Sequence, residues 1–268
     1  MNFSLYCLNF RSLFKLFFLF SVKMTLLNCT MIDVQSMSIT TDFWWKPTAN
    51  TLAYYPFTSS TTIQDRSWNN RNLTNNWTQF WIYWWINCAY FQSANTKKLY
   101  WTLPLTWNQN FTINVYIKRS GNSAISWNNW SQIFVLWNTG SSWWCFGTAI
   151  RNWNSEVTNK NAYVNYTRWT DKDSSYTNTL NVWRMITVIN NGWNIKMYEN
   201  WVLINNNSIS FNINSTNFTI WSFPSAIGGV WDYQSFYWYM SEFIVENKVR
   251  TLSEIQAYYN KTKSKYGL

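Results

Sequence analysis

The placement of tryptophan constrains this chain most, because many Trp residues stand where a folded chain needs a turn. The sequence has 22 Trp and only 7 Gly in 268 residues, whereas glycine alone averages about 7% of a globular protein. Trp sits inside polar clusters such as DRSWNN at 65–70, LTNNWT at 73–78, SWNNWS at 126–131, NNGWN at 190–194 and YENWVLIN at 198–205. Such clusters predict turns, but turns favour Gly, Asn, Asp and Pro.

We therefore hypothesise that most of these Trp residues are glycines, encoded by UGA in a genome that reads UGA as Gly. Asn200 and Trp201 would then form the Asn-Gly pair of a two-residue hairpin, which requires positive φ. A Trp in that conformation costs roughly 1–2 kcal/mol. The alternative is a Trp-rich binding protein, and UGG codons at Trp68, Trp77 and Trp201 would exclude the hypothesis. Trp183 lies inside an apolar strand pattern and is expected to be genuine.

Charge leaves the partner class open. The net charge of +10 comes from 21 basic and 11 acidic residues, which suits an acidic partner such as nucleic acid, an anionic glycan or a membrane surface. The basic residues are scattered, apart from Lys261, Lys263 and Lys265, and no nucleic-acid-binding motif accompanies them. We expect no nucleic-acid partner.

The first 40 residues differ from the rest. Arg11 and Lys15 precede the apolar run LFFLFSV at 16–22, and Lys23 follows it. This pattern resembles a signal peptide or a membrane anchor, and the alternative is a start codon assigned too early. We predict a leader over 1–40, one domain over 41–268, a secreted or cell-surface location, and membrane contact only through the leader.

Short β-branched and aromatic runs separated by polar clusters predict an all-β domain. The expected strands cover 51–57, 79–91, 111–119, 132–137, 162–167, 182–189, 195–200 and 239–247. One helix is predicted after Thr251, where Thr251 and Glu254 form a capping box. The spacing of the turns favours two antiparallel sheets packed as a sandwich, with the helix docked on it.

With Trp read as Gly, residues 236–268 resemble the end of laminin-G-like and concanavalin-A-like lectin domains, in which a Phe-x-Gly strand precedes an Asn turn and a short helix. Three further segments resemble that family in the same order: 52–76, 111–118 and 182–205, where Trp183 matches a Trp common in the family. The resemblance implies a two-sheet jelly roll that binds carbohydrate or protein on a surface protein, sometimes with calcium.

Asp65 and Asn69, in the loop DRSWNN, are candidate calcium ligands, because carboxylate and amide oxygens are the hard ligands that calcium takes. Asp232 joins them if its loop lies nearby. The alternative is an Asx turn that only shapes the loop. Asp171 and Asp173 form another acidic pair, for which a solvated loop is the default interpretation.

An enzymatic function is not expected. The chain has no His, so carboxylates would have to act as acid and base. Glu242 and Glu246 share a strand face, but four residues of strand separate them by about 13 Å, beyond the roughly 5–9.5 Å of glycoside hydrolysis. We expect solvated charges there.

Cysteines and tyrosines offer further alternatives. Cys88 and Cys145 form the only plausible intradomain pair; a disulfide is one outcome, and buried free thiols are favoured. Tyr54, Tyr55 and Tyr116 could stack on sugars, but their strand positions favour the core.

The sequence therefore predicts a non-catalytic, secreted or cell-surface binding module, which recognises carbohydrate or a surface protein through loops at the sandwich edge. Two alternatives stay open. One is a glycan-active enzyme of the concanavalin-A-like glucanase class, and the other is a purely structural segment of a surface protein.

Overall fold

The structure, a computed structural model, describes residues 45–58, 63–76, 78–83, 85–91, 98–103, 105, 109–122, 129–138, 141–152, 161–167, 171–177, 179–192, 194–209, 216–220 and 236–268. These residues lie in one compact unit that runs from Trp44 to Leu268. The predicted leader over 1–40 lies outside the described residues. Within the described ranges, no helix combines the length and the apolar character needed to cross a membrane.

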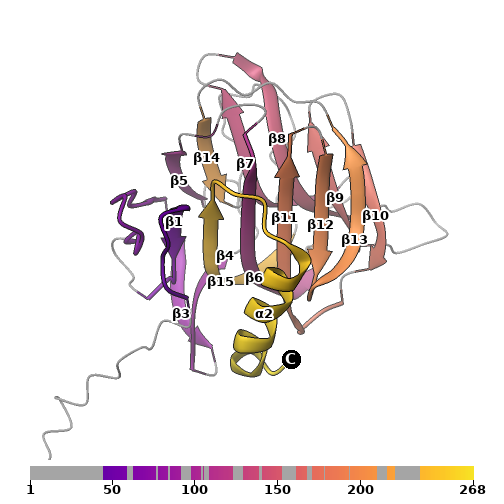
Figure 1. The fold of residues 1–268 in the computed structure, drawn as a ribbon. Helices are drawn as coiled ribbons and strands as arrows, with labels where there is room; N and C mark the ends of the chain where they lie inside the picture. The colour runs from indigo at the N-terminus through magenta and orange to yellow at the C-terminus, as the bar shows by residue number, and fades with distance from the viewer. Residues whose placement is uncertain are drawn as a thin grey trace, which may run out of the picture. The chain divides into compact units, whose positions relative to one another are not determined.

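Two antiparallel sheets form the domain, as predicted (Figure 1). The eight-stranded sheet has the order β13-β12-β11-β6-β15-β4-β3, with β1 paired to β15. Its strands are β1 (Thr51–Tyr55), β3 (Gln79–Tyr83), β4 (Ile86–Phe91), β6 (Phe111–Asn122), β11 (Trp183–Asn191), β12 (Asn194–Glu199), β13 (Val202–Ser208) and β15 (Phe236–Glu246).

The seven-stranded sheet has the order β10-β9-β8-β7-β14-β5-β2. Its strands are β2 (Thr74–Asn76), β5 (Lys98–Leu103), β7 (Asn129–Asn138), β8 (Ser141–Asn152), β9 (Asn161–Thr167), β10 (Asp171–Thr177) and β14 (Thr216–Ile220). The two sheets pack face to face, which makes the fold the predicted β-sandwich.

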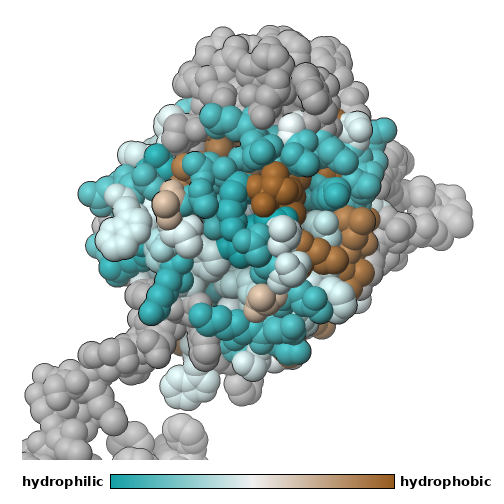
Figure 2. Space-filling model, in the orientation of Figure 1, coloured by the Kyte–Doolittle hydropathy of each residue, from teal (hydrophilic) through white to brown (hydrophobic). Residues whose placement is uncertain are grey.

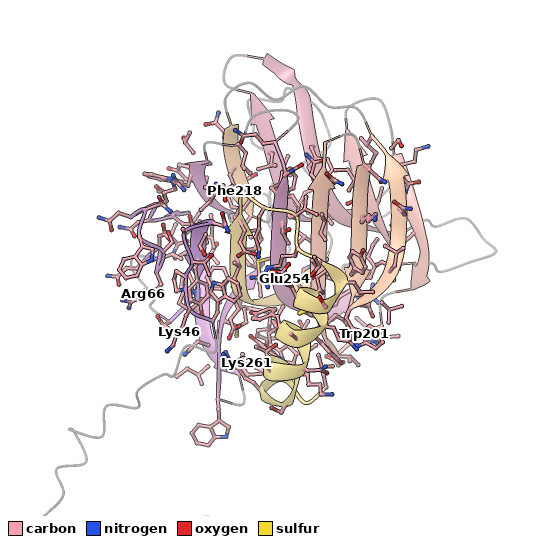
Figure 3. The ribbon with its side chains drawn as sticks, in the orientation of Figure 1. Lys46, Arg66, Trp201, Phe218, Glu254 and Lys261 are labelled. Atoms are coloured by element: carbon pink, nitrogen blue, oxygen red, sulfur yellow. The ribbon has the colours of Figure 1, made fainter. Side chains whose placement is uncertain are left out.

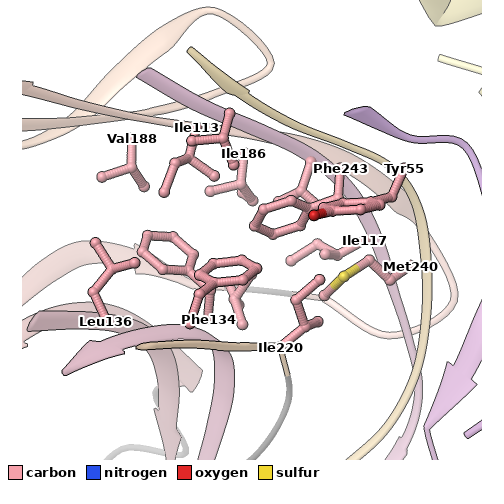
Figure 4. Close-up of a cluster of buried hydrophobic side chains, with 14 of the residues drawn as sticks. Tyr55, Ile113, Ile117, Phe134, Leu136, Ile186, Val188, Ile220, Met240 and Phe243 are labelled. Atoms are coloured by element: carbon pink, nitrogen blue, oxygen red, sulfur yellow. The ribbon is translucent and has the colours of Figure 1, made fainter. Parts of the chain in front are cut away.

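Alternation along the strands builds the core between the sheets. In β6, Phe111, Ile113, Val115 and Ile117 are all buried in it, and period-2 spacing points such residues to one face. Phe134 of the seven-stranded sheet meets Phe243 of the eight-stranded sheet edge to face, with ring centroids 6.1 Å apart (Figure 4). Each fully buried side chain of this size contributes about 1.5–3 kcal/mol to the free energy of unfolding. Burial of this core therefore stabilises the packing of the two sheets.

The C-terminal helix α2 (Leu252–Thr262) begins at the predicted capping box. Thr251 accepts from the backbone N–H of Glu254, and the Glu254 side chain accepts from the N–H of Thr251. Hydrogen bonds from Lys248 and Thr251 lower the pKa of Glu254 to about 2, so the cap persists at neutral pH and is lost as the pH falls through that value. The 3-10 helix η2 (Lys263–Tyr266) follows. Together they cover part of the outer face of the eight-stranded sheet, around Ser241 and Glu242 (Figure 1).

The single strand predicted over 79–91 is wrong, because the chain turns back within it. Tyr83 pairs with Ile86, so only two residues separate β3 from β4, and Trp85 is the described one. Trp85 has φ of +71° and is 92% exposed. Read as Gly-Gly, this loop is an ordinary hairpin signal.

Two more hairpins have the same form. The pairing of Asn191 with Asn194 leaves two residues between β11 and β12, of which Gly192 is described, and that of Glu199 with Val202 leaves the loop Asn200-Trp201. Asn200 and Trp201 have φ of +48° and +69°, so the predicted hairpin is confirmed. Figure 3 shows Trp201 on the far side of α2 from Lys46 and Arg66.

Other Trp residues fill buried positions. Trp183 is 5% exposed and packs edge to face on Tyr266, as expected for a genuine Trp. Trp238 is 1% exposed in β15, at a position that the lectin-like resemblance reads as glycine. Trp68 is exposed but keeps negative φ, and Trp77 lies outside the described residues. Among the tryptophans that the structure describes, positive φ therefore singles out Trp85 and Trp201.

Candidate functional site

The predicted calcium loop is a closed hydrogen-bond network around Asp65. One carboxylate oxygen accepts from the N–H groups of Tyr54 at 2.9 Å and Ser67 at 2.8 Å. The other accepts from the Ser67 hydroxyl at 2.6 Å and the Arg71 N–H at 2.9 Å. Asp65 is only 7% exposed. This is the geometry of the alternative interpretation, an Asx turn that shapes the loop.

Asn69 supports the same loop. Its amide donates to the carbonyl oxygens of Thr51 at 2.8 Å and Leu52 at 3.2 Å, which fastens the loop to β1. Asp232 lies outside the described residues, and the side chains of Asp171 and Asp173, on β10, are also outside them. Among the side chains that are described, no three metal-ligating groups gather. Calcium at this loop stays a prediction.

Glu242 and Glu246 are not the solvated charges expected from the sequence. They are 2% and 0% exposed, because α2 and the segment before it cover them. Glu242 accepts from the Tyr258 hydroxyl at 2.7 Å and pairs with Lys265. Glu246 pairs with Arg250. These carboxylates bind the C-terminal segment to the sheet and lie buried beneath it.

A β-bulge aims Glu242 at the helix. Between the pairs Ser241–Tyr116 and Ile244–Asn114, two residues of β15 face the single residue Val115. Glu242 takes φ of +51° there, a conformation that costs a non-glycine residue roughly 1–2 kcal/mol. Ser241 and Glu242 consequently both reach α2 and η2, while Phe243 enters the core.

The remaining candidates are structural. Tyr54, Tyr55 and Tyr116 are at most 1% exposed, so they are packing residues, as their strand positions favoured. Cys88 is a buried free thiol, and burial raises its pKa to about 12, which confirms the favoured interpretation for that residue. The side chain of Cys145 lies outside the described residues.

A group of partly exposed aromatics was missed by the sequence reasoning. Tyr90 and Tyr239 stack with ring centroids 4.7 Å apart, and Tyr83 lies 4.9 Å from Tyr239. The ammonium of Lys118 lies 3.8 Å above the Tyr83 ring and donates to its hydroxyl at 2.5 Å. We call these four residues the tyrosine platform. Alternation in β4 and β15 could have revealed it, had 79–91 been recognised as a hairpin.

Sequence comparison places the chain in no family: no protein-family model matches it, and no curated protein is similar in sequence. Solved structures do share the fold. The binding domain of Paraclostridial Mosquitocidal Protein 1 superposes with a TM-score of 0.59 at 18% identity, over 79% of this chain and 52% of that one. The likeness confirms a β-sandwich shared with toxin binding domains.

Two botulinum neurotoxin structures give the same result. Type C, which depends on interaction with two ganglioside molecules to enter cells, superposes with a TM-score of 0.57 at 16% identity over 79% of this chain and 51% of that one. The binding domain of type DC in complex with rat synaptotagmin II gives 0.56 at 15% identity over 79% and 51%. The chain spans about half the length of the structures it matches.

Proposed function

We propose that this chain is a non-catalytic binding module of a secreted or cell-surface protein, which recognises a glycan or a protein on a target surface. The observation that carries the proposal is the sandwich shared with toxin binding domains, one from a toxin that interacts with ganglioside and one bound to synaptotagmin. The burial of Glu242 and Glu246 beneath the C-terminal segment supports a non-catalytic role, because it removes the acid pair that the enzymatic alternative would use.

Binding of the purified full chain to a glycan array and to intact cells tests this function. We expect saturable binding to at least one acidic or neutral glycan, or to a protease-sensitive cell-surface component, without release of reducing sugar. Reducing-sugar release would favour the glycan-active enzyme instead. Absence of both binding and release would leave the purely structural segment and overturn the proposal.

We also propose that the chain is a laminin-G-like or concanavalin-A-like domain whose turn tryptophans are UGA-encoded glycines. Three two-residue hairpin loops have Trp at their second position, and the described ones, Trp85 and Trp201, have positive φ. That position of a type I′ turn takes glycine by preference. Peptide mass spectrometry of the protein from its natural source decides the matter, since Gly and Trp differ greatly in mass.

Replacing the turn tryptophans by glycine is expected to stabilise the protein. Trp85→Gly and Trp201→Gly each remove a strained left-handed residue, worth roughly 1–2 kcal/mol, against the greater unfolded-state entropy of glycine. The net gain is about 1 kcal/mol for each in urea unfolding followed by circular dichroism. The matched control, Trp183→Gly, empties a buried position and should cost about 3–5 kcal/mol. A loss of stability in both turn variants would contradict the glycine hypothesis.

Calcium binding at Asp65, Asn69 and Asp232 is retained as a proposal that rests on the oxygen ligands these side chains offer and on the lectin-like resemblance. Because Asp65 already accepts from four donors, an ion would have to replace some of those bonds. Thermal unfolding in millimolar calcium and in chelator tests it: a higher midpoint with calcium that disappears in Asp65→Asn supports a site, and equal midpoints exclude one.

A further inference from the structure

We propose that the tyrosine platform on the outer face of the eight-stranded sheet binds a carboxylate-bearing sugar, with the rings of Tyr90 and Tyr239 contacting the sugar and Lys118 pairing with its carboxylate. This inference rests on the proposed binding function. It specifies the binding site and the class of ligand. It also places the ligand on a sheet face, whereas the sequence predicted binding through the edge loops.

Strand register brings the platform together. Lys118 of β6 lies directly opposite Tyr239 of β15, and Tyr239 lies directly opposite Tyr90 of β4. Tyr83, at the end of β3, completes the group through its contacts with Tyr239 and Lys118. Residues opposite one another on adjacent strands have Cβ atoms about 4.5–5.5 Å apart. Lys118, Tyr239 and Tyr90 therefore form one row across three neighbouring strands. Tyr83 stands outside this register, because it pairs with Ile86 and not with Tyr90, and it reaches the row through its side-chain contacts.

The row faces outward and α2 stops short of it. Ala89 and Met240, which flank Tyr90 and Tyr239 in their strands, belong to the core between the sheets, so the two tyrosines point to the opposite face. The helix covers the next row, at Tyr116 and Ser241. All three platform tyrosines remain partly exposed.

The exposed chemistry suits a sugar. Tyrosine combines an apolar ring with a polar hydroxyl, and a sugar likewise combines apolar C–H faces with hydroxyl groups. Burial raises the pKa of Tyr90 and of Tyr239 above the usual value, so both hydroxyls stay protonated at neutral pH and act as donors as well as acceptors. The rings already stack on one another, which reduces the side-chain entropy lost on binding.

Charge selects an acidic sugar. Lys118 is 6% exposed, and its ammonium uses one N–H on the Tyr83 hydroxyl, whereas an ammonium carries three. The described carboxylates are engaged elsewhere: Asp65 in its loop, Glu199 with Arg184, Glu242 with Lys265, Glu246 with Arg250 and Glu254 with Lys248. None of them contacts the platform, and the whole chain carries +10. The ammonium of Lys118 therefore attracts the carboxylate of a sugar bound at the platform.

The outer face of the eight-stranded sheet has a largely polar surface. Figure 2 shows the α2 side of the molecule as largely hydrophilic, with one hydrophobic group near the middle of the view and another over β12 and β13; Val202 and Leu203 of β13 are exposed. That apolar area lies at the opposite edge of the sheet from β3 and β4. None of the four platform residues is a tryptophan, although Trp81 of β3 packs edge to face on Tyr90, with ring centroids 6.1 Å apart.

Calorimetric titration of the full chain with 3′-sialyllactose and with lactose tests the site. We expect weak binding of 3′-sialyllactose, weaker still at high salt, and at least tenfold weaker binding of lactose. Lys118→Met keeps the aliphatic stem and should abolish this preference. Tyr239→Phe removes one hydroxyl and should weaken the binding of both sugars. Tyr239→Ala removes the ring as well and should abolish the binding of both sugars.

Lys196→Met is the matched control, because it makes the same change on β12, away from the platform; it should bind as the unmodified chain does. Circular dichroism of each variant checks that the sandwich is retained. Unchanged discrimination in a folded Lys118→Met variant would overturn the site while leaving a binding function intact, as would no binding of 3′-sialyllactose by a chain that binds another array glycan. Failure to bind any glycan or cell surface would overturn both.

Discussion

Glu242→Ala is expected to lower the free energy of unfolding by about 3–5 kcal/mol, the usual cost of breaking one partner of a buried ion pair. The carboxylate is 2% exposed, and two groups of the C-terminal segment depend on it: the Tyr258 hydroxyl at 2.7 Å and the ammonium of Lys265. Alanine leaves both without that acceptor beneath the helix. Alanine does not relieve the strain of the positive φ at this bulge, because it also has a Cβ.

Urea unfolding followed by far-ultraviolet circular dichroism measures the loss. Lys261→Ala, at an exposed position of the same helix, is the matched control and should leave the unfolding midpoint nearly unchanged. The double variant Glu242→Ala with Lys265→Met should recover part of the loss, because it no longer buries an unpaired ammonium. A loss below about 1 kcal/mol in Glu242→Ala would show that the pair does not hold the helix.

Asp65→Ala is expected to cost about 3–5 kcal/mol, because it leaves several donors without an acceptor in a buried loop, each worth about 1–3 kcal/mol. The backbone N–H groups of Tyr54 and Arg71 both point at this carboxylate, from β1 and from the far end of the loop. Without it, the loop loses the centre that joins its two ends. We expect faster proteolysis between residues 65 and 72 as well as a lower unfolding midpoint.

Ser67→Ala is the graded control for Asp65. It removes one hydroxyl donor and retains the backbone bonds, so it should cost about 1 kcal/mol. The loss of stability in Asp65→Asn should fall between those of Ser67→Ala and Asp65→Ala. Its amide NH2 group replaces one acceptor oxygen and therefore faces a donor of the loop. If all three substitutions had equal, small effects, the Asp65 network would not organise the loop.

Period-2 alternation predicted the core strands of the eight-stranded sheet well. Strand β6, with Phe111, Ile113, Val115 and Ile117 buried, and strand β11 lie where the pattern placed them. Several partner strands were missed, such as β10 (DKDSSYT) and β13 (VLINNNS). These two are edge strands, with too few apolar residues for their sequence to show the alternation.

The site residues likewise differ in how far the sequence could predict them. Asp65 and Asn69 were found because a loop that fixes its own backbone leaves a local signature, although that signature could not separate an Asx turn from a calcium loop. The fate of Glu242 was not predictable, since its exposure depends on a helix that begins ten residues later and on a bulge that reorients it. The tyrosine platform combines β3, β4, β6 and β15, so no single segment contains it.

By itself the sequence determined the all-β class, the capped C-terminal helix and the hairpin turn at Asn200 and Trp201, because each depends on residues within a few positions of one another. Only the tertiary structure decided which faces are covered. It buried Glu242 and Glu246 beneath the C-terminal segment, placed Tyr116 there too, and left Tyr90 and Tyr239 at the surface. A strand's alternation gives two faces, but long-range packing alone determines which of them meets water.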